Sequence, residues 1–115
     1  MPGTIFEPFD VVVVPFPFTD KPVVKRRPAL VASSRAFNDN HDQLILAMIT
    51  AAARSDWPSD THIRNWRAAG LAVPCRVRLK LFTLESRVIV RRLGALAAED
   101  RQTVQAALSK GLARA

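Results

Sequence analysis

The chain of 115 residues contains one cysteine, Cys75, and no tyrosine. A single cysteine cannot close a disulfide within the chain, which excludes the disulfide-stabilised class of small secreted domains. Only two histidines are present, and no spacing of Cys and His residues matches a metal site. We therefore expect Cys75 to be a buried, unreactive thiol and the protein to work without a metal or another cofactor.

Long apolar segments are also missing. The apolar stretch at residues 11–18 is interrupted by Pro15 and Pro17, so it is too short and too broken to cross a membrane as a helix. The first nine residues have no basic segment followed by an apolar core, as a secretory signal would. These absences predict a cytoplasmic protein. The length, without repeats or low-complexity tracts, predicts a single domain over residues 1–115.

Acidic residues are scarce. The chain has 10 Asp and Glu against 17 Lys and Arg, a formal net charge of +7, which favours a polyanionic partner, either a nucleic acid or an acidic protein segment. Residues 21–35 contain five basic residues and no acid, and residues 76–92 contain six with only Glu85 against them. Each segment alone could be an ordinary solvated face, but together with the net charge they favour a binding groove.

Short apolar runs separated by turn residues predict a mainly β protein. Val11–Val14 is a run of β-branched residues that suits a buried central strand. Pro15 and Pro17 should end this strand because proline has no amide hydrogen. Further strands are expected at residues 28–33, 44–50, 61–66, 76–81 and 88–93. The loop at residues 51–60 has no regular pattern, and its length indicates function or variability.

The strand at residues 76–81 alternates strictly between cationic and apolar side chains. In a regular strand this spacing separates the two kinds onto opposite faces. We expect the apolar residues to join the core and the cations to form an open basic face. The cations are Arg76, Arg78 and Lys80, and the apolar residues are Val77, Leu79 and Leu81.

Two segments have helical signals. One turn should follow Ser34, which can cap it, with Phe37 as its anchor. A longer helix is expected from Ala97, with late cations Lys110 and Arg114 that suit the helix dipole. Its apolar stripe comprises Leu96, Val104, Ala107, Leu108 and Leu112. Five or six strands with one packed C-terminal α-helix predict a mainly β (α+β) fold, a small, strongly twisted antiparallel β-barrel.

Cationic donors gather in the loop between the first two strands, where binding residues are common. Arg27 stands before Pro28, which stiffens the entry to the second strand, and its planar guanidinium can hold two phosphate oxygens at once. Thr50 ends the third strand, which in a small barrel can lie next to the second. From the residues alone, a surface cation at Arg27 and a satisfied hydroxyl at Thr50 remain the simpler interpretation.

Four ordered segments resemble the MazF/PemK family of toxin endoribonucleases from bacterial toxin–antitoxin pairs. They are DVVVVPFPFTD at residues 10–20 with RRPALV at 26–31, LAMIT at 46–50, VRLKLFTL at 77–84 and VIVRRLG at 88–94. The resemblance covers nearly the whole chain. It implies an SH3-like barrel, a homodimer, sequence-selective and metal-independent cleavage of single-stranded RNA, and neutralisation by a cognate antitoxin with an acidic, disordered tail.

Under this resemblance Arg27 and Thr50 match the family's catalytic arginine and threonine. RNA contacts would come from Phe18, Thr19, Asp20, Lys25, Arg26, Arg78 and Lys80. Cleavage by the adjacent 2′-hydroxyl requires a stabilised phosphorane and two proton transfers. The group that moves the protons is not assigned, because the loop at 21–26 lacks the acid found in several branches and His41 and His62 lie away from the motif segments.

Two further departures from the family are Phe9, where Gly is common, and Ala51, where a second hydroxyl or amide is frequent. An alternative function is that of a non-enzymatic toxin of the CcdB branch, which binds a protein target such as DNA gyrase. A third is a nucleic-acid-binding barrel without toxicity, since small barrels host many functions. CcdB-like action needs neither Arg27 nor Thr50, so this pair favours the nuclease.

Overall fold

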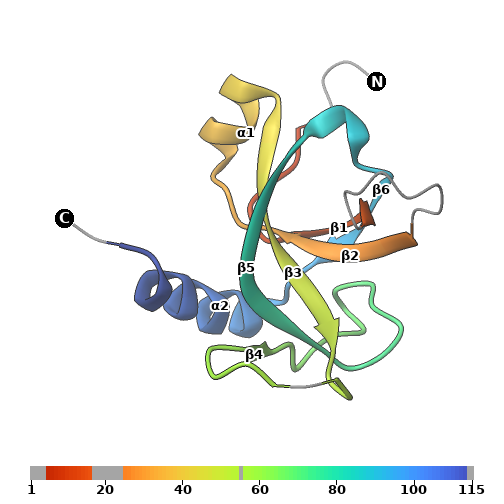
Figure 1. The fold of residues 1–115 in the computed structure, drawn as a ribbon, viewed down its shortest axis with the longest axis vertical. Coiled ribbons are helices and arrows are strands. Elements are labelled where there is room, and N and C mark those ends of the chain that lie inside the picture. The colour runs from red at the N-terminus through yellow and green to blue at the C-terminus, as the bar shows by residue number, and fades with distance from the viewer. Residues whose placement is uncertain (1–4, 17–24, 55, 114–115) are drawn as a thin grey trace.

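The computed structural model describes residues 5–16, 25–54 and 56–113, so Phe18, Thr19 and Asp20 lie outside the described part. Within it, one antiparallel sheet has the strand order β4-β5-β3-β2-β1-β6, and the strands curl into a half-barrel (Figure 1). The strands are β1 Asp10–Phe16, β2 Lys25–Val31, β3 Gln43–Ala51, β4 Thr61–His62, β5 Cys75–Glu85 and β6 Arg91–Ala95. The helices are α1 Arg35–His41, the 3₁₀ turn η1 Ser86–Val88 and α2 Ala98–Gly111. The predicted barrel-like β fold with a C-terminal helix is confirmed.

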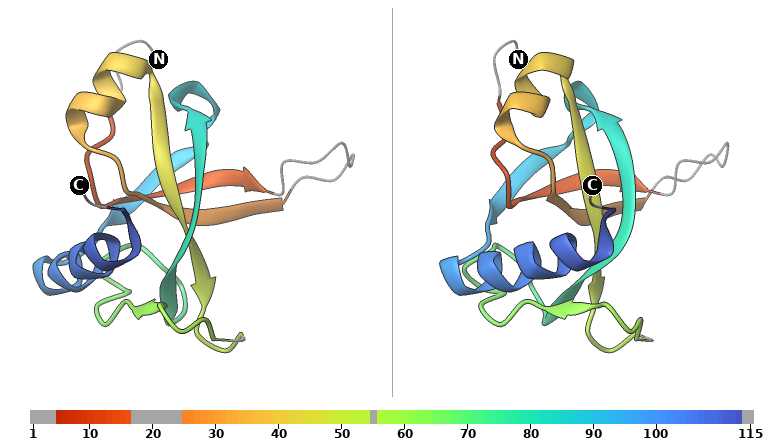
Figure 2. Two further views of the ribbon diagram at one scale, coloured as in Figure 1. Left: turned by 60° about the vertical axis from the view of Figure 1, so that its left-hand side comes forward. Right: turned by 90° about the vertical axis from the view of Figure 1, so that its left-hand side faces the viewer.

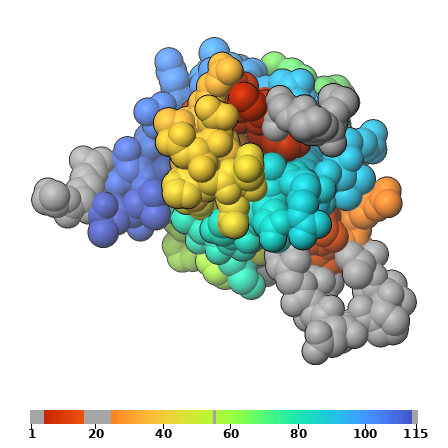
Figure 3. All heavy atoms as spheres, turned by 90° about the horizontal axis from the view of Figure 1, so that it is seen from above, coloured from red at the N-terminus to blue at the C-terminus, as the bar shows by residue number. Residues whose placement is uncertain are grey.

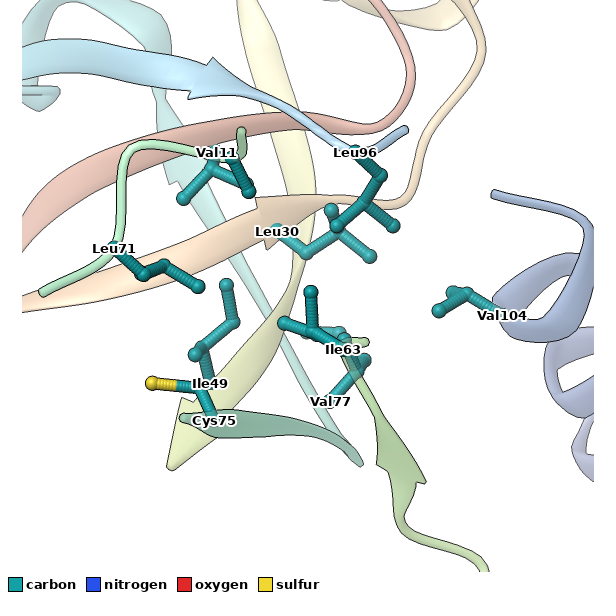
Figure 4. Packing of buried hydrophobic residues seen from close by; sticks show 11 residues of the cluster. Val11, Leu30, Ile49, Ile63, Leu71, Cys75, Val77, Leu96 and Val104 are labelled. Atoms are coloured by element: carbon teal, nitrogen blue, oxygen red, sulfur yellow. The ribbon is translucent and has the colours of Figure 1, made fainter. Parts of the chain in front are cut away.

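The strands are buried on both faces because alternate side chains enter two separate apolar clusters. Along β3, Leu44 and Leu46 enter one cluster, and Ala47 and Ile49 enter the other. Figure 4 shows the cluster that Ile49 enters: Val11, Leu30, Ile49 and Val77 converge from neighbouring strands, and Val104 of α2 points toward them. Figure 2 shows α2 lying across this side of the sheet. The opposite face of the sheet is not covered by α2, so it can hold a site beyond the end of the cluster that Leu44 and Leu46 enter.

The cluster on the opposite face closes the top of the half-barrel. It contains Phe6, Val12, Val14, Ala29, Val31, Leu44 and Leu46. Seen from above, α1 and η1 lie side by side over this end (Figure 3), joined by a hydrogen bond of 2.9 Å from the Ser86 amide to the Asp42 carbonyl. Ser34 caps α1 as predicted, since its Oγ accepts from the Phe37 amide at 3.1 Å. The buried anchor of α1 is Asn38 rather than Phe37.

A double insertion in β5 overturns the predicted basic face of this strand. Met48 pairs with Arg78 but Ala47 pairs with Leu81, so Leu79 and Lys80 are extra residues on β5. Strict alternation requires an uninterrupted ladder, and a bulge ends it, so Leu81 beyond the bulge is 37% exposed. Arg76 lies before the bulge and is buried with 2% exposure because the loop carbonyls of Ala52 and Arg54 cover it. The three cations do not form one open face.

Other predicted boundaries shift by a few residues. β4 is limited to Thr61–His62, and β6 begins at Arg91 after the η1 turn rather than at residue 88. Leu112, placed on the buried stripe from its spacing, follows the end of α2 and is 51% exposed. No helix in the described ranges is long and apolar enough to span a membrane.

Three described residues, Phe9, Asp42 and Gly70, have a positive φ, which favours glycine. Gly70 has φ +83°, and a Cβ there would collide with the backbone of Leu93 in β6, so this turn requires glycine. Phe9 has φ +70°, at the position where the resemblance places glycine. Its ring packs against the core cluster, and the Arg101 guanidinium lies 5.5 Å from the ring centroid. These contacts offset the unfavourable backbone conformation.

Candidate functional site

Pro28 ends the pairing of β2 with β3. The Val13 carbonyl accepts a hydrogen bond from Val90 on the β6 side, so Val13 and its partner Pro28 on β2 exchange none. The backbone of residue 28 therefore faces β3, where proline has no hydrogen to donate. The β2–β3 ladder accordingly runs from Val31 only as far as Ala29, which pairs with Met48. Beyond this point the two strands diverge (Figures 1 and 2).

Arg27 and Thr50 lie on either side of this divergence. Ala29 and Met48 are the last paired residues of β2 and β3, and Arg27 and Thr50 each lie two residues beyond them, on the same face as that pair. Opposite residues of antiparallel strands share one face of the sheet. Both side chains are partly buried. The predicted pair therefore shares one face of the sheet, on either side of the point where the ladder opens.

The same face carries this row across two more strands. Thr50 pairs with Arg76 of β5, and Arg76 pairs with His62 of β4. Four side chains, those of Arg27, Thr50, Arg76 and His62, therefore lie on neighbouring strands in one line. Thr50, Arg76 and His62 stand on paired strands about 4.8 Å apart, whereas Arg27 lies across the gap between β2 and β3. His62 is exposed. Its place in this row could not be inferred from the sequence, because β4 is only two residues long and irregular chain follows it.

Arg76 is the buried member of the row and fixes the loop that follows Thr50. Its guanidinium donates to the Ala52 carbonyl at 2.6 Å and to the Arg54 carbonyl. It also forms ion pairs with Asp56 and, at 3.8 Å, with Asp60. Asp56 is 82% exposed and Asp60 only 3%, so the pair with Asp60 is the less screened of the two. Arg76 therefore connects the paired end of β3 to the loop at residues 52–60.

Arg78 holds the other end of this loop. Its Nε and one terminal nitrogen donate to the two Asp60 carboxylate oxygens at 3.1 and 2.9 Å, a bidentate geometry that fixes both side chains. The Asp60 carboxylate also accepts from the Trp57 amide at 3.0 Å. The Arg78 guanidinium lies 4.9 Å from the centroid of the Trp57 ring. We call Trp57, Asp60, Arg76 and Arg78 the loop latch.

Protonation of Asp60 should weaken the loop latch. The hydrogen bond from Arg78 lowers the pKa of Asp60 below its ordinary value of 3.8, burial opposes this in part, and the Trp57 amide adds to the lowering. A carboxyl with a lower pKa in the folded state stabilises the fold above its unfolded pKa and loses that contribution as pH falls through the folded value. The latch should therefore be intact at neutral pH and fade below about pH 4.

This pH dependence is measurable as a difference between two thermal unfolding curves. The wild-type protein should unfold at a higher temperature than Asp60→Asn, with a constant gap above about pH 5 that narrows below pH 4. A gap that stays constant below pH 4 would contradict this role of the Asp60 carboxylate. Asp39→Asn, at an exposed position of α1, is the matched control.

The remaining predicted RNA contacts fall into three groups. Lys25 and Arg26 are exposed at the start of β2, beside Arg27. Lys80 is exposed at the β5 bulge, whereas Arg78 is engaged in the loop latch. No group of metal-ligating side chains is found in the ranges that the structure describes. Cys75 is free and buried, and burial raises the pKa of its thiol.

Several folds known from crystals are similar to this one. The MazE–MazF complex (Form-III) from Deinococcus radiodurans has a TM-score of 0.74 at 19% identity, covering 96% of this chain and 100% of the other. An endoribonuclease in complex with its cognate antitoxin from a mycobacterial species has a TM-score of 0.72 at 14% identity, covering 96% and 98%. The Mycobacterium tuberculosis toxin MazF-mt6 has a TM-score of 0.69 at 19% identity, covering 88% and 93%.

Sequence comparison identifies the family. No curated protein matches the chain. The model of the family described as PemK-like, MazF-like toxin of type II toxin-antitoxin system matches residues 7–112, a range that includes Arg27, Thr50 and the loop latch. The resemblance in the strand motifs is thereby confirmed: the chain belongs to the PemK-like, MazF-like toxins of type II toxin–antitoxin systems.

Proposed function

We propose that this toxin is a metal-independent endoribonuclease that cuts single-stranded RNA in a sequence-selective way. The observation that carries the proposal is that Arg27 and Thr50 share one sheet face, on either side of the point where Pro28 ends the β2–β3 ladder. A guanidinium and a hydroxyl on one face suit the binding of a phosphate group, which has several oxygens to be held. The family, whose members are generally endoribonucleases, supports the same activity.

The reaction needs charge stabilisation more than covalent chemistry. The 2′-hydroxyl next to the scissile phosphate attacks phosphorus, the 5′-oxygen of the following nucleotide leaves, and a 2′,3′-cyclic phosphate remains. Arg27 is proposed to hold two phosphate oxygens of the phosphorane, and Thr50 to donate its hydroxyl hydrogen to an oxygen of the same group. Donors placed where charge develops contribute about 10²- to 10³-fold each.

Substrate binding is proposed to use the cations around this pair. Lys25 and Arg26 are exposed beside Arg27, and Lys80 is exposed on β5, so phosphates on either side of the cut can reach a positive charge. Arg78 is proposed to act within the loop latch, on the same sheet face as Thr50. Phe18, Thr19 and Asp20 remain proposed contacts outside the described residues.

Neutralisation by a cognate antitoxin is proposed from the same charge distribution. Two similar structures were solved as complexes with an antitoxin. A net charge of +7 favours an antitoxin with an acidic tail, which would compete with RNA for Lys25 and Arg26.

We also propose a homodimer, and sedimentation at tens of micromolar should give twice the chain mass. A measured mass equal to that of a single chain would contradict the dimer.

The function is tested with purified protein and a long RNA in EDTA. The expected result is cleavage at a small set of sequences, leaving 5′-hydroxyl ends, and no cleavage where the nucleotide before the cut is 2′-deoxy. Cleavage that stops when EDTA is added would contradict metal independence. Intact RNA together with inhibition of DNA gyrase would support the CcdB-like alternative instead.

A further inference from the structure

Trp57 is a large aromatic side chain that remains 40% exposed on the loop after β3. The other tryptophan, Trp66, packs against the core cluster. Tryptophan is mostly buried in folded proteins, so an exposed indole beside a candidate site calls for a partner. The nature of that partner can be inferred from how the indole is held.

The other members of the loop latch hold the indole in place. The Arg78 guanidinium lies 4.9 Å from the ring centroid, and Arg78 is itself held by two hydrogen bonds to Asp60. Trp57 and Asp60 also bond through their backbones, since the Asp60 amide donates to the Trp57 carbonyl at 3.0 Å. Because these contacts order the ring before any ligand arrives, a ligand that stacks on it loses little additional conformational freedom.

Trp57 lies on the same side of the sheet as the candidate catalytic pair. Arg78, which the indole contacts, pairs with Met48, and Met48 is two residues before Thr50 on β3. Residues two apart on a strand share a face. A single strand held at Arg27 and Thr50 can therefore extend along this face toward Trp57.

We propose that Trp57 is a stacking platform for one unpaired base of the RNA, close to the cut site. The proposal rests on the proposed function and names a base-binding subsite within it. Every base has a π-face, and stacking on an exposed aromatic ring is a general way of holding single-stranded nucleic acid. The arginine on the indole adds a cation–π contact to the stack. The Ala51–Asp60 loop, expected to influence which bases are recognised, would act through this ring.

The charge of the subsite gives it a distinct signature. Asp60 balances the charge of Arg78 within hydrogen-bonding distance, so the platform contributes stacking and little net attraction for phosphate. Loss of the indole should therefore weaken RNA binding without changing its dependence on salt. Loss of Lys25 and Arg26, which are exposed, should weaken binding and also lower the salt slope by about 0.7 per phosphate contact on a single strand.

The test measures binding to an oligonucleotide that contains the sequence cut by the wild-type protein, with a 2′-deoxy residue at the cut position. Trp57→Ala should lower the affinity about 5- to 100-fold at an unchanged salt slope. Trp57→Phe should recover most of the loss because it keeps an aromatic face. Val73→Ala, which truncates another exposed apolar side chain, should bind like the wild type.

An abasic scan of the same oligonucleotide locates the stacked base. At one position, removal of the base should weaken binding to the wild-type protein but not to Trp57→Ala, as a double-mutant cycle requires for a direct contact. Wild-type affinity in Trp57→Ala, or coupling at no position, would overturn the platform while the nuclease function stands. A change in sedimentation of Trp57→Ala without RNA would assign the indole to a subunit interface. A wild-type protein that binds no RNA would reject both the platform and the proposed function.

Discussion

Replacement of Arg27 by alanine should reduce RNA cleavage at least 100-fold while the protein stays folded. The guanidinium is only partly buried and lies where the β2–β3 ladder has ended, so few backbone contacts depend on it. Its loss removes the proposed charge on the phosphorane, and a single donor of this kind contributes about 10²- to 10³-fold to the rate. Initial rates of RNA cleavage under saturating RNA, with circular dichroism of each variant, give the measurement.

The conservative variants separate geometry from charge. Arg27→Lys keeps a positive charge but cannot bind two oxygens with a planar fork, so it should restore little activity. Thr50→Val keeps the shape of the side chain without its hydroxyl and should also lose most of the rate. Arg35→Ala removes an exposed cation paired with Glu7 near α1 and should cleave normally.

Arg27 and Thr50 should also behave as a unit. Because both are proposed to act on one phosphate, the double variant should lose less than the product of the two single losses, as is usual for groups that act together. Full cleavage by Arg27→Ala in EDTA, with an unchanged spectrum, would refute the assignment. Retained cleavage by Thr50→Val alone would confine the chemistry to the arginine.

The central strands could be predicted from the sequence because their signals are local. A run of four valines can be satisfied only by burial on both faces, as in β1. Arg27 and Thr50 were singled out by the family resemblance, since their residue types alone also suit a surface cation and a satisfied hydroxyl. The expectation that the second and third strands are neighbours is met by β2 and β3.

The loop latch could not be predicted because its partners are brought together by a bulge and an irregular loop. The alternation at residues 76–81 predicted exposed cations, yet Arg76 is buried under the carbonyls of residues 52 and 54. The one available signal was the pair of acids, Asp56 and Asp60, in a loop of an otherwise basic chain. Acids that precede a cationic strand indicate pairing, but they do not say which cation is buried.

Replacement of Arg76 by methionine should destabilise the protein by about 3–5 kcal/mol. The substitution keeps much of the volume but leaves the Ala52 and Arg54 carbonyls without their charged donor, and each hydrogen bond from a charged group contributes about 1.5–3 kcal/mol. For a domain with a total stability of about 5–15 kcal/mol this is a large fraction. Urea unfolding at pH 7 measures the change.

Matched variants show whether the cost comes from burial or from charge alone. Arg35→Ala breaks an exposed ion pair at 3.5 Å and should cost less than about 1 kcal/mol. Combining Asp60→Asn with Arg76→Met gives the coupling energy between these two side chains, which should be small because they lie 3.8 Å apart and Asp60 stays paired with Arg78 in Arg76→Met. An Arg76→Met protein within 1 kcal/mol of the wild type would mean that Arg78 alone holds the loop. In that case RNA binding through Trp57 should survive the loss of Arg76 and depend on Arg78.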